Sequence, residues 1–251
     1  MQRNRYAGKK ILFCIVAVFI VLIVLTGLVF LKKLPLNQLW IGAYDVRGVD
    51  ISHYQGTVDM REIEQQDMKF IFIKATEGSS NVDEKFYENW GNASKTKLYT
   101  GAYHFFSFDS PGKKQAENYI ATVGNLAGKL IPVVDVEYYG NKEKNPPNKK
   151  DMSENLTTFL SELEEEYGVK PMIYTTYKVY YRYIKDRFTE YPLWIRNVYY
   201  KPNGDLGRQW DFWQYSDTAR LEGYNGREKY IDCNVFYGLP EQLSGYVVPK
   251  S

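Results

Sequence analysis

Cysteine is nearly absent from this sequence of 251 residues, which contains only Cys14 and Cys233. Cys14 lies in a long apolar run and Cys233 in the polar body of the chain, so no disulfide bond can form within that body. Two thiols also cannot supply a typical four-ligand zinc site. The body must therefore be held together by its hydrophobic core.

Histidine is equally scarce, with only His53 and His104 in the whole chain. Neither has a second ligand at metal-binding spacing, so the sequence predicts no metal site and no cofactor. His104 is part of the run "GAYHFF", in which it reads as a structural residue. We expect neither histidine to act as a catalytic base.

Clustered positive charge is also missing from the body. Of 32 Lys and Arg residues, six lie in the first 33 residues, which hold no acid, so the remainder carries 26 basic against 30 acidic residues and a net charge near −4. Nucleic-acid-binding proteins usually show a clustered basic face. We therefore expect no nucleic-acid partner, and the sequence identifies no protein partner.

A long apolar run is present at residues 11–31, where 21 uncharged residues span about 31 Å as a helix at ~1.5 Å per residue. The run is longer than the ~7–15 apolar residues of a cleaved signal peptide and ends without a small-x-small site. The positive-inside rule predicts a single-pass protein of the cytoplasmic membrane with its N-terminus inside and its body outside. The flanking basic residues are Arg3, Arg5, Lys9, Lys10, Lys32 and Lys33.

Short β-rich runs recur along the body, and amphipathic segments with helix-start signals separate them. Asp59 and Asp151 each precede a glutamate by three residues, as in a capping box, and Ser110 precedes a proline. The predicted helices occupy residues 59–66, 83–95, 110–123 and 151–167. The predicted strands between them occupy residues 46–52, 69–75, 98–108, 129–137 and 170–175.

Three further strands are predicted at 191–197, 208–216 and 230–236, with little helix between the last two. Five strand–helix units followed by three strands indicate an α/β fold with a closed, partly irregular barrel. The expected organisation is a cytoplasmic N-terminus at 1–10, a transmembrane anchor at 11–31, a linker at 32–45, the barrel at 46–240 and a tail at 241–251.

Two carboxylates, Asp135 and Glu137, end the apolar run "LIPVVDVE". Residues i and i+2 of a strand point to the same face, with Cα atoms roughly 6–7 Å apart. At the carboxyl end of a barrel strand, such a pair suits a glycosidic bond, where one acid protonates the leaving oxygen and a second group stabilises the developing positive charge. The alternative is a solvated or salt-bridged pair without function.

Asp50 and Asp232 lie in the first and last predicted strands of the barrel, which become neighbours if the barrel closes. Four acids from three strands would then converge on one mouth. Each of these two residues has an alternative reading as a capping or salt-bridge residue.

Several motifs follow one another in the order found in glycoside hydrolase family 25, the Chalaropsis-type lysozymes, which the chain resembles from about Gly48 to Gly238. The motifs are "GVDISHYQG", "FIFIKATEG", "GAYHFF", "PVVDVE", "PLWI", "FWQYS" and "IDCNVF". The resemblance implies an irregular TIM-like barrel, (β/α)5(β)3, and hydrolysis of the β-1,4 bond between N-acetylmuramic acid and N-acetylglucosamine in peptidoglycan glycan strands.

The resemblance also implies roles for the four acids. Glu137 is the expected proton donor, and Asp135 holds the N-acetyl group of the substrate or stabilises the anomeric carbon directly. Asp50 and Asp232 orient Glu137, raise its pKa or bind substrate. Sugar rings stack on aromatic rings and hydrogen-bond to polar groups. The candidates for these contacts, each with core packing as the alternative, are Tyr103, Tyr174, Trp194 and Gln214.

The sequence departs from the family pattern at Arg196 and Asn197 and in the basic, proline-rich loop 139–150. These departures leave the preferred glycan length open. Two alternative functions remain: a wall-binding module without turnover, and a glycosidase of different specificity such as a chitinase-like enzyme. The usual D-x-x-D-x-D-x-E run of a chitinase is absent, and the four acids of the resemblance are intact.

Overall fold

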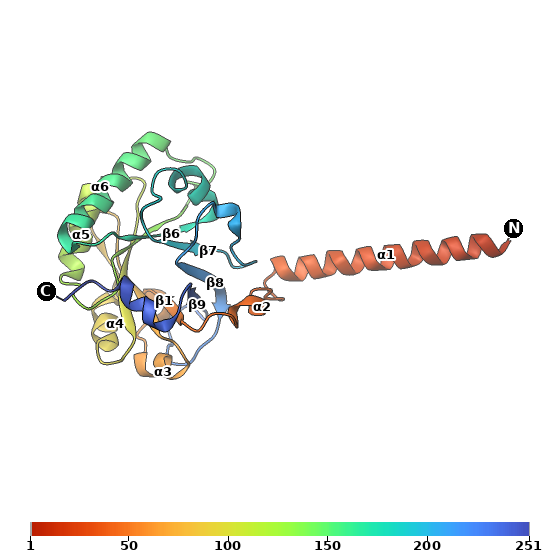
Figure 1. Cartoon of the computed structure of the whole chain (residues 1–251), viewed down its shortest axis with the longest axis horizontal. Helices are drawn as coiled ribbons and strands as arrows, with labels where there is room; N and C mark the ends of the chain where they lie inside the picture. The colour runs from red at the N-terminus through yellow and green to blue at the C-terminus, as the bar shows by residue number, and fades with distance from the viewer. Residues whose placement is uncertain (1, 251) are drawn as a thin grey trace.

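The computed structural model describes the backbone of residues 2–250 and the side chains of residues 10–250. Its strands form one sheet with the order β1-β9-β8-β7-β6-β5-β4-β2-β3, and β1 also pairs with β2, which closes eight strands into a barrel (Figure 1). The strands are β1 Arg47–Ile51, β2 Phe70–Glu77, β3 Asn81–Val82, β4 Tyr99–Phe105, β5 Val133–Val136, β6 Met172–Thr176, β7 Leu193–Arg196, β8 Phe212–Ala219 and β9 Ile231–Phe236.

The barrel is parallel from β1 through β2, β4, β5, β6 and β7 to β8, whereas β9 runs antiparallel to both β8 and β1. The predicted α/β barrel of five strand–helix units and three further strands is therefore confirmed. Every predicted strand is present, although the strand expected at 129–137 is reduced to the four residues of β5. The two-residue strand β3 had no signal in the sequence.

Helices lie against the outside of the barrel, and α1 projects away from it (Figure 1). The α-helices are α1 Gln2–Phe30, α2 Gln38–Ile41, α3 Met60–Gln65, α4 Phe86–Ala93, α5 Gly112–Val123, α6 Lys149–Tyr167 and α7 Tyr177–Val179. A π-turn, η2 Tyr180–Ile184, follows α7, and three 3-10 turns are η1 His53–Gln55, η3 Gly204–Leu206 and η4 Pro240–Tyr246.

The helix starts differ in detail from the predictions. Asp59 caps α3 by accepting from two backbone N–H groups, but its own N–H donates to the Gly223 carbonyl at 2.7 Å, so the reciprocal half of the capping box does not form. The prediction that Asp151 caps α6 was wrong, because the Asn148 side chain already accepts from the first N–H groups of that helix. Ser110 does not cap α5, which begins after Pro111.

Aromatic rings fill the part of the barrel interior that lies away from the carboxyl-end mouth. Phe72 packs on Trp194 with ring centroids 4.6 Å apart, and Phe212 lies 5.2 Å from Phe70 and 5.0 Å from Phe236. All five side chains are buried. Alternate strand residues face the interior, so interior residues nearer the carboxyl ends of the parallel strands, such as Asp50 two positions after Gly48, face the mouth beyond this aromatic layer. In the antiparallel strand β9 the residues before Phe236 do so.

Two glycines make room for these rings. A Cβ on Gly48 would lie 2.4 Å from the Phe70 ring, and one on Gly101 would lie 2.6 Å from the Phe72 ring. Interior packing is too dense to absorb such an overlap without displacing a ring. Because Gly48 lies two residues before Asp50, the same backbone segment serves both the aromatic layer and the mouth.

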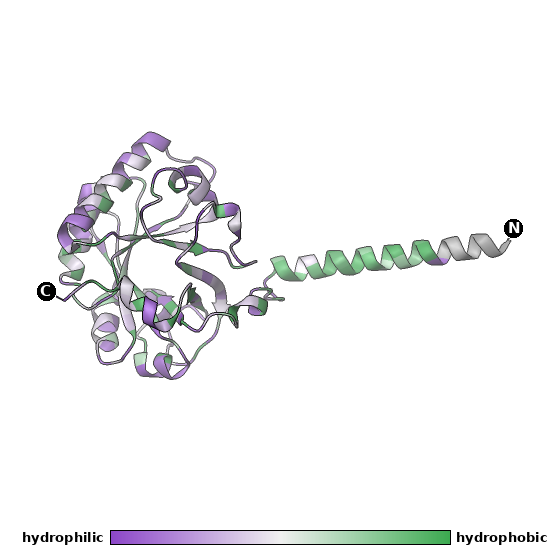
Figure 2. Cartoon of the chain, viewed as in Figure 1, coloured by the Kyte–Doolittle hydropathy of each residue, from purple (hydrophilic) through white to green (hydrophobic). Residues whose placement is uncertain are grey.

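The apolar helix α1 projects from the barrel, and most of its length is hydrophobic (Figure 2). Residues Lys10–Phe30, 21 in number, are long and apolar enough to cross a membrane. The segment after the helix, for which the sequence predicts a linker at 32–45, contains α2 and packs on the barrel. Asn37, Ile41 and Tyr44 are buried there, and the Tyr44 ring lies 5.6 Å from that of Trp210.

Replacing Gly48 by Ala is expected to lower the free energy of unfolding by about 1–3 kcal/mol, because the new methyl group overlaps the Phe70 ring. Gly91→Ala is the matched control, since nothing lies within 4 Å of its Cβ position in α4 and alanine favours a helix by roughly 0.5–1 kcal/mol. Urea unfolding of the full chain in detergent, followed by tryptophan fluorescence, measures both. Equal stability of the two variants would contradict the packing argument.

Candidate active site

A pocket of about 300 Å³ opens at the carboxyl-end mouth of the barrel. Its lining includes every residue that the sequence analysis assigned to a site, although these residues are spread over more than 180 positions. They are Asp50, Tyr103, Asp135, Glu137, Tyr174, Trp194, Gln214 and Asp232. The strands thus bring together the predicted acids and the predicted sugar-contacting residues.

The four acids come from three places on the barrel wall. Asp50 of β1 and Asp232 of β9 are directly paired in the sheet, as barrel closure requires. Asp135 is the third residue of β5, and Glu137 follows the strand by one residue. Asp50 and Asp135 are buried, whereas Glu137 and Asp232 are half-buried and more open to the pocket.

Two side-chain amides hold Asp50 in place. Its Oδ2 accepts hydrogen bonds from Asn234 Nδ2 at 2.7 Å and from Gln214 Nε2 at 2.9 Å. The amide oxygens are themselves bound, because Tyr174 OH donates to Gln214 Oε1 and Trp194 Nε1 donates to Asn234 Oδ1, both at 2.9 Å. These outer donors fix which way each amide points, so each NH₂ group faces the carboxylate.

Burial is the main cause of the unusual titration of these acids. It raises the pKa of Asp50 to about 6, although the hydrogen bonds from Asn234 and Gln214 act in the opposite direction. Burial, reinforced by the charge of Glu137, raises the pKa of Asp135 well above its usual range. Burial and the charges of Asp50 and Asp217 do the same for Asp232. The four acids cannot all be ionised together near neutral pH.

Two cations partly offset this effect. Burial raises the pKa of Glu137, and the charges of Arg196 and Lys74 lower it. Lys74 lies in the pocket lining with its Nζ 2.6 Å from Glu77 Oε2, an ion pair that the sequence analysis left out of the site. Arg196, one of the departures from the family pattern, ends β7 with its guanidinium 2.6 Å from Asp217.

The four predicted sugar-contacting residues differ in exposure. Tyr103 is half-buried, whereas Tyr174, Trp194 and Gln214 are at most 6% exposed. The last three therefore reach the pocket with little surface and mainly support Asp50. Tyr54, which is 52% exposed, and Tyr230 also line the pocket. Tyr54 lies in the turn η1, where strand periodicity gives no signal, whereas Tyr230 lies in the strand predicted at 230–236 and was not singled out there.

Asn234 is the clearest omission from the sequence analysis. It lies two residues after Asp232 in β9 and therefore faces the same side of the strand. The i and i+2 rule that paired Asp135 with Glu137 would have placed Asn234 beside Asp232.

The two histidines have other partners. His104 is buried between Thr76 and Gln115, at 2.7 and 3.0 Å, and burial lowers its pKa to about 3. His53 Nδ1 lies 2.7 Å from the buried carboxylate of Asp83. Among the side chains that the structure describes, no group of three His, Cys, Asp or Glu residues is placed to hold a metal ion.

Comparisons with known proteins agree with this geometry. The profile of Glycosyl hydrolases family 25 matches residues 49–224. The chain is similar to a solved family 25 glycosyl hydrolase from Bacillus anthracis, with 50% identity, a TM-score of 0.78 and coverage of 82% of this chain and 94% of that one. It is 33% identical to the uncharacterised protein YegX of Escherichia coli K12, covering 82% and 74% of the two chains. It is 29% identical to Lysozyme M1 of Streptomyces globisporus, covering 79% and 70%.

Asn234→Ala is expected to raise the pKa of Asp50 above 6 by about one to two units, because it removes a charge-assisted hydrogen bond that stabilises the carboxylate. Carbon-13 NMR of labelled aspartate side chains across a pH titration measures the change. Asn203→Ala, at an exposed position of the loop before η3, is the control and should leave the titration unchanged. A pKa of Asp50 that does not move in Asn234→Ala would contradict this account of the clamp.

Proposed function

This chain belongs to glycosyl hydrolase family 25, and from that membership we propose that it is a membrane-anchored lysozyme, which hydrolyses the β-1,4 bond between N-acetylmuramic acid and N-acetylglucosamine in peptidoglycan. The enzyme class is that of a glycoside hydrolase with muramidase activity, as in the relative named Lysozyme M1. The biological role is cleavage or remodelling of the cell wall.

The observation that carries this proposal is the convergence of four carboxyl groups on one pocket above an aromatic layer. Glycoside hydrolysis needs one carboxyl that keeps its proton and one that carries negative charge, on the two sides of the scissile bond. Burial and mutual repulsion among the four acids create this division of charge without a metal ion or cofactor.

We assign the proton donation to Glu137. It follows β5 directly and is more open to the pocket than Asp135, so its carboxyl reaches the leaving oxygen of a bound glycan. Burial keeps its pKa above the usual range, which retains the proton that the leaving group needs. Asp135, on the same face of the chain, orients the N-acetyl group of the substrate or stabilises the anomeric carbon directly.

Asp50 and Asp232 support this pair from the opposite wall. Gln214 Nε2 contacts both, at 2.9 and 3.2 Å, and so holds the two carboxyls together. The charge of Asp50 helps to raise the pKa of Asp135, and the charges of Asp50 and Glu137 help to raise that of Asp232. Among the aromatic residues, Tyr103 contacts the sugar, whereas Tyr174, Trp194 and Gln214 position the acids from behind and present a small part of their surface to it.

The proposed location is the outer side of the cytoplasmic membrane, with residues 11–31 as a single-pass anchor and the N-terminus inside. The length and composition of α1 support the anchor. The basic residues before the apolar run support the orientation. Peptidoglycan lies outside this membrane, so the orientation places the barrel on the side of its substrate and confines the hydrolase near the wall.

Glu137→Gln is expected to lower turnover of purified peptidoglycan by about 10²–10⁴-fold, because it removes the acidic proton while preserving shape. The full chain in detergent is incubated with peptidoglycan, and the released fragments are reduced with borohydride and identified by mass spectrometry. Glu165→Gln, at an exposed position of α6, is the matched control and should retain activity.

The reducing ends distinguish the alternatives. Reduced muramic acid from the wild type, lost in Glu137→Gln, supports a muramidase. Reduced glucosamine would indicate a glucosaminidase instead. Absence of fragments from the wild type would contradict the proposed function and favour a wall-binding module.

A further inference from the structure

The segment that follows the apolar helix is bound to the barrel wall and does not hang free. The Asn37 side chain is buried, and its Nδ2 donates to the carbonyl oxygens of Tyr215 at 2.7 Å and Asn197 at 3.1 Å. The ring of Phe30, at the end of α1, lies 5.8 Å from that of Tyr199. The chain therefore enters the barrel domain along the ends of β7 and β8, where the mouth of the barrel lies.

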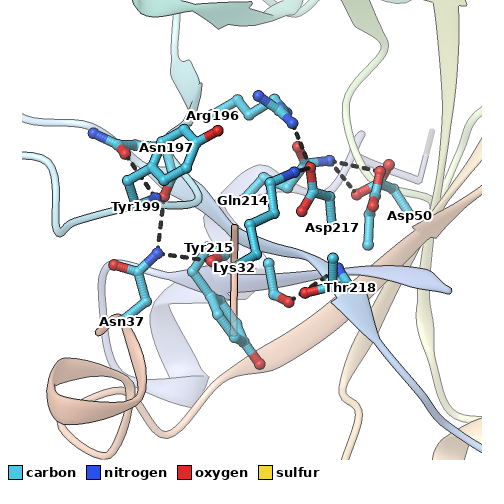
Figure 3. A network of polar contacts seen from close by, with 12 residues as sticks. Lys32, Asn37, Asp50, Arg196, Asn197, Tyr199, Gln214, Tyr215, Asp217 and Thr218 are labelled. Atoms are coloured by element: carbon cyan, nitrogen blue, oxygen red, sulfur yellow. Dashed lines mark hydrogen bonds and ion pairs between the residues drawn. The ribbon is translucent and has the colours of Figure 1, made fainter. Parts of the chain in front are cut away.

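One carboxylate joins this segment to the catalytic pocket. Lys32 Nζ lies 2.5 Å from Asp217 Oδ2, and Arg196 Nη2 lies 2.6 Å from the same oxygen. Figure 3 shows both cations converging on Asp217, with Gln214 and Asp50 beside them. Asp217 lines the catalytic pocket and also a second, smaller pocket whose lining includes Lys32 and Asn37.

The two ion pairs of Asp217 differ from a fully exposed surface pair, which contributes little to stability. The side chain of Asp217 is 16% exposed and those of Lys32 and Arg196 are each 30% exposed, so solvent screens the contacts only partly. A single carboxylate bound by Arg196 alone would neutralise most of the positive charge of the guanidinium. Because Lys32 shares the same oxygen, Arg196 is held in place while the trio keeps a net positive charge.

That positive charge acts on the catalytic acids. Arg196 opposes the effect of burial on the pKa of Glu137, and Lys74 is the other cation that does so. The charged and titratable groups around the guanidinium are Lys32, Asp50, Asp135, Glu137, Tyr174, Asp217 and Asp232. Displacement of the Arg196 guanidinium away from the acids would therefore change the protonation of Glu137 directly.

We propose that Lys32 is a positioning residue of the active site: by sharing Asp217 with Arg196, it holds the guanidinium where its charge acts on the catalytic carboxyls. This inference rests on the proposed function. It also gives the departure from the family pattern at position 196 a role, because the Arg196 side chain is linked to the segment through Asp217. The chain with its anchor segment docked is then the fully active form, and cleavage between the anchor and Asn37 lowers activity.

The test compares Lys32→Gln with Lys33→Gln, both in the full chain in detergent. Lys33 is exposed and adjacent, so its substitution removes the same charge without the contact to Asp217. Lys32→Gln is expected to lower kcat roughly fivefold to tenfold with little change in KM, since Lys32 does not line the catalytic pocket. Lys32→Arg should restore kcat to within about twofold of the wild type, as a conservative replacement that keeps the ion pair.

The pH profile separates positioning from a structural effect. Loss of positive charge near the acids favours their protonated forms and raises their pKa, so both limbs of the kcat profile should move to higher pH in Lys32→Gln. A merely destabilised protein would lose activity without moving the limbs. If Lys32→Gln gave the rate and profile of Lys33→Gln, the proposal would be overturned.

Docking itself is tested without activity, by the rate of trypsin cleavage after Lys33. The bound segment must open locally before it is cut, so Asn37→Ala, which removes both hydrogen bonds to the barrel, should be cut several-fold faster than the wild type. Equal rates would overturn the proposal. If the wild type is docked but releases no fragments from peptidoglycan, the proposed function alone fails. Carbon-13 NMR titration of the acids then tests the positioning role of Lys32 without activity. Acid pKa values that Lys32→Gln leaves unchanged would overturn that role.

Discussion

Closure of the barrel at β1 is the constraint on which the rest of the structure depends. This strand pairs with β2 on one side and β9 on the other, and only this double pairing places Asp50 beside Asp232. The same closure surrounds the aromatic layer and turns the carboxyl ends of the strands into a single mouth. Gly48 links the aromatic layer to the mouth, because it leaves space for the Phe70 ring and lies two residues before Asp50 in the same strand.

The free-energy cost of burying the acids arises from the same barrel closure that brings them together. Buried carboxyls are unfavourable when ionised, and each of the four has at least one close acidic neighbour. The barrel offsets this cost with oriented donors, Asn234 and Gln214, and with two cations, Arg196 and Lys74. The remaining repulsion keeps a proton among the acids, which is the property that a glycoside hydrolase requires of its general acid.

The apolar helix α1 and the pocket are connected by a short segment that is bound to the barrel. The chain passes from α1 over the ends of β7 and β8 before it forms β1, so the approach to the barrel runs beside its mouth. In the proposed function, in which α1 is the membrane anchor, this attachment limits which glycan strands the pocket can reach. Asp217 connects the segment and the pocket electrostatically, because it forms ion pairs with Lys32 of the segment and with Arg196 at the end of β7.

The sequence by itself determined the features that depend on local order. The apolar run, the strand periodicity and the spacing of Asp135 and Glu137 act over a few residues, and they predicted the barrel and the residues that line its mouth. Tertiary structure alone decided the contacts between distant segments. Lys32 meets Asp217 across 185 positions, and Asn234 meets Asp50 across 184. Such pairs depend on the register and closure of the barrel, so the local sequence around one partner does not predict the other. The helix cap Asn148 was missed for a local reason. Several polar residues can accept from the first N–H groups of the helix, and the geometry of the preceding loop selects one of them.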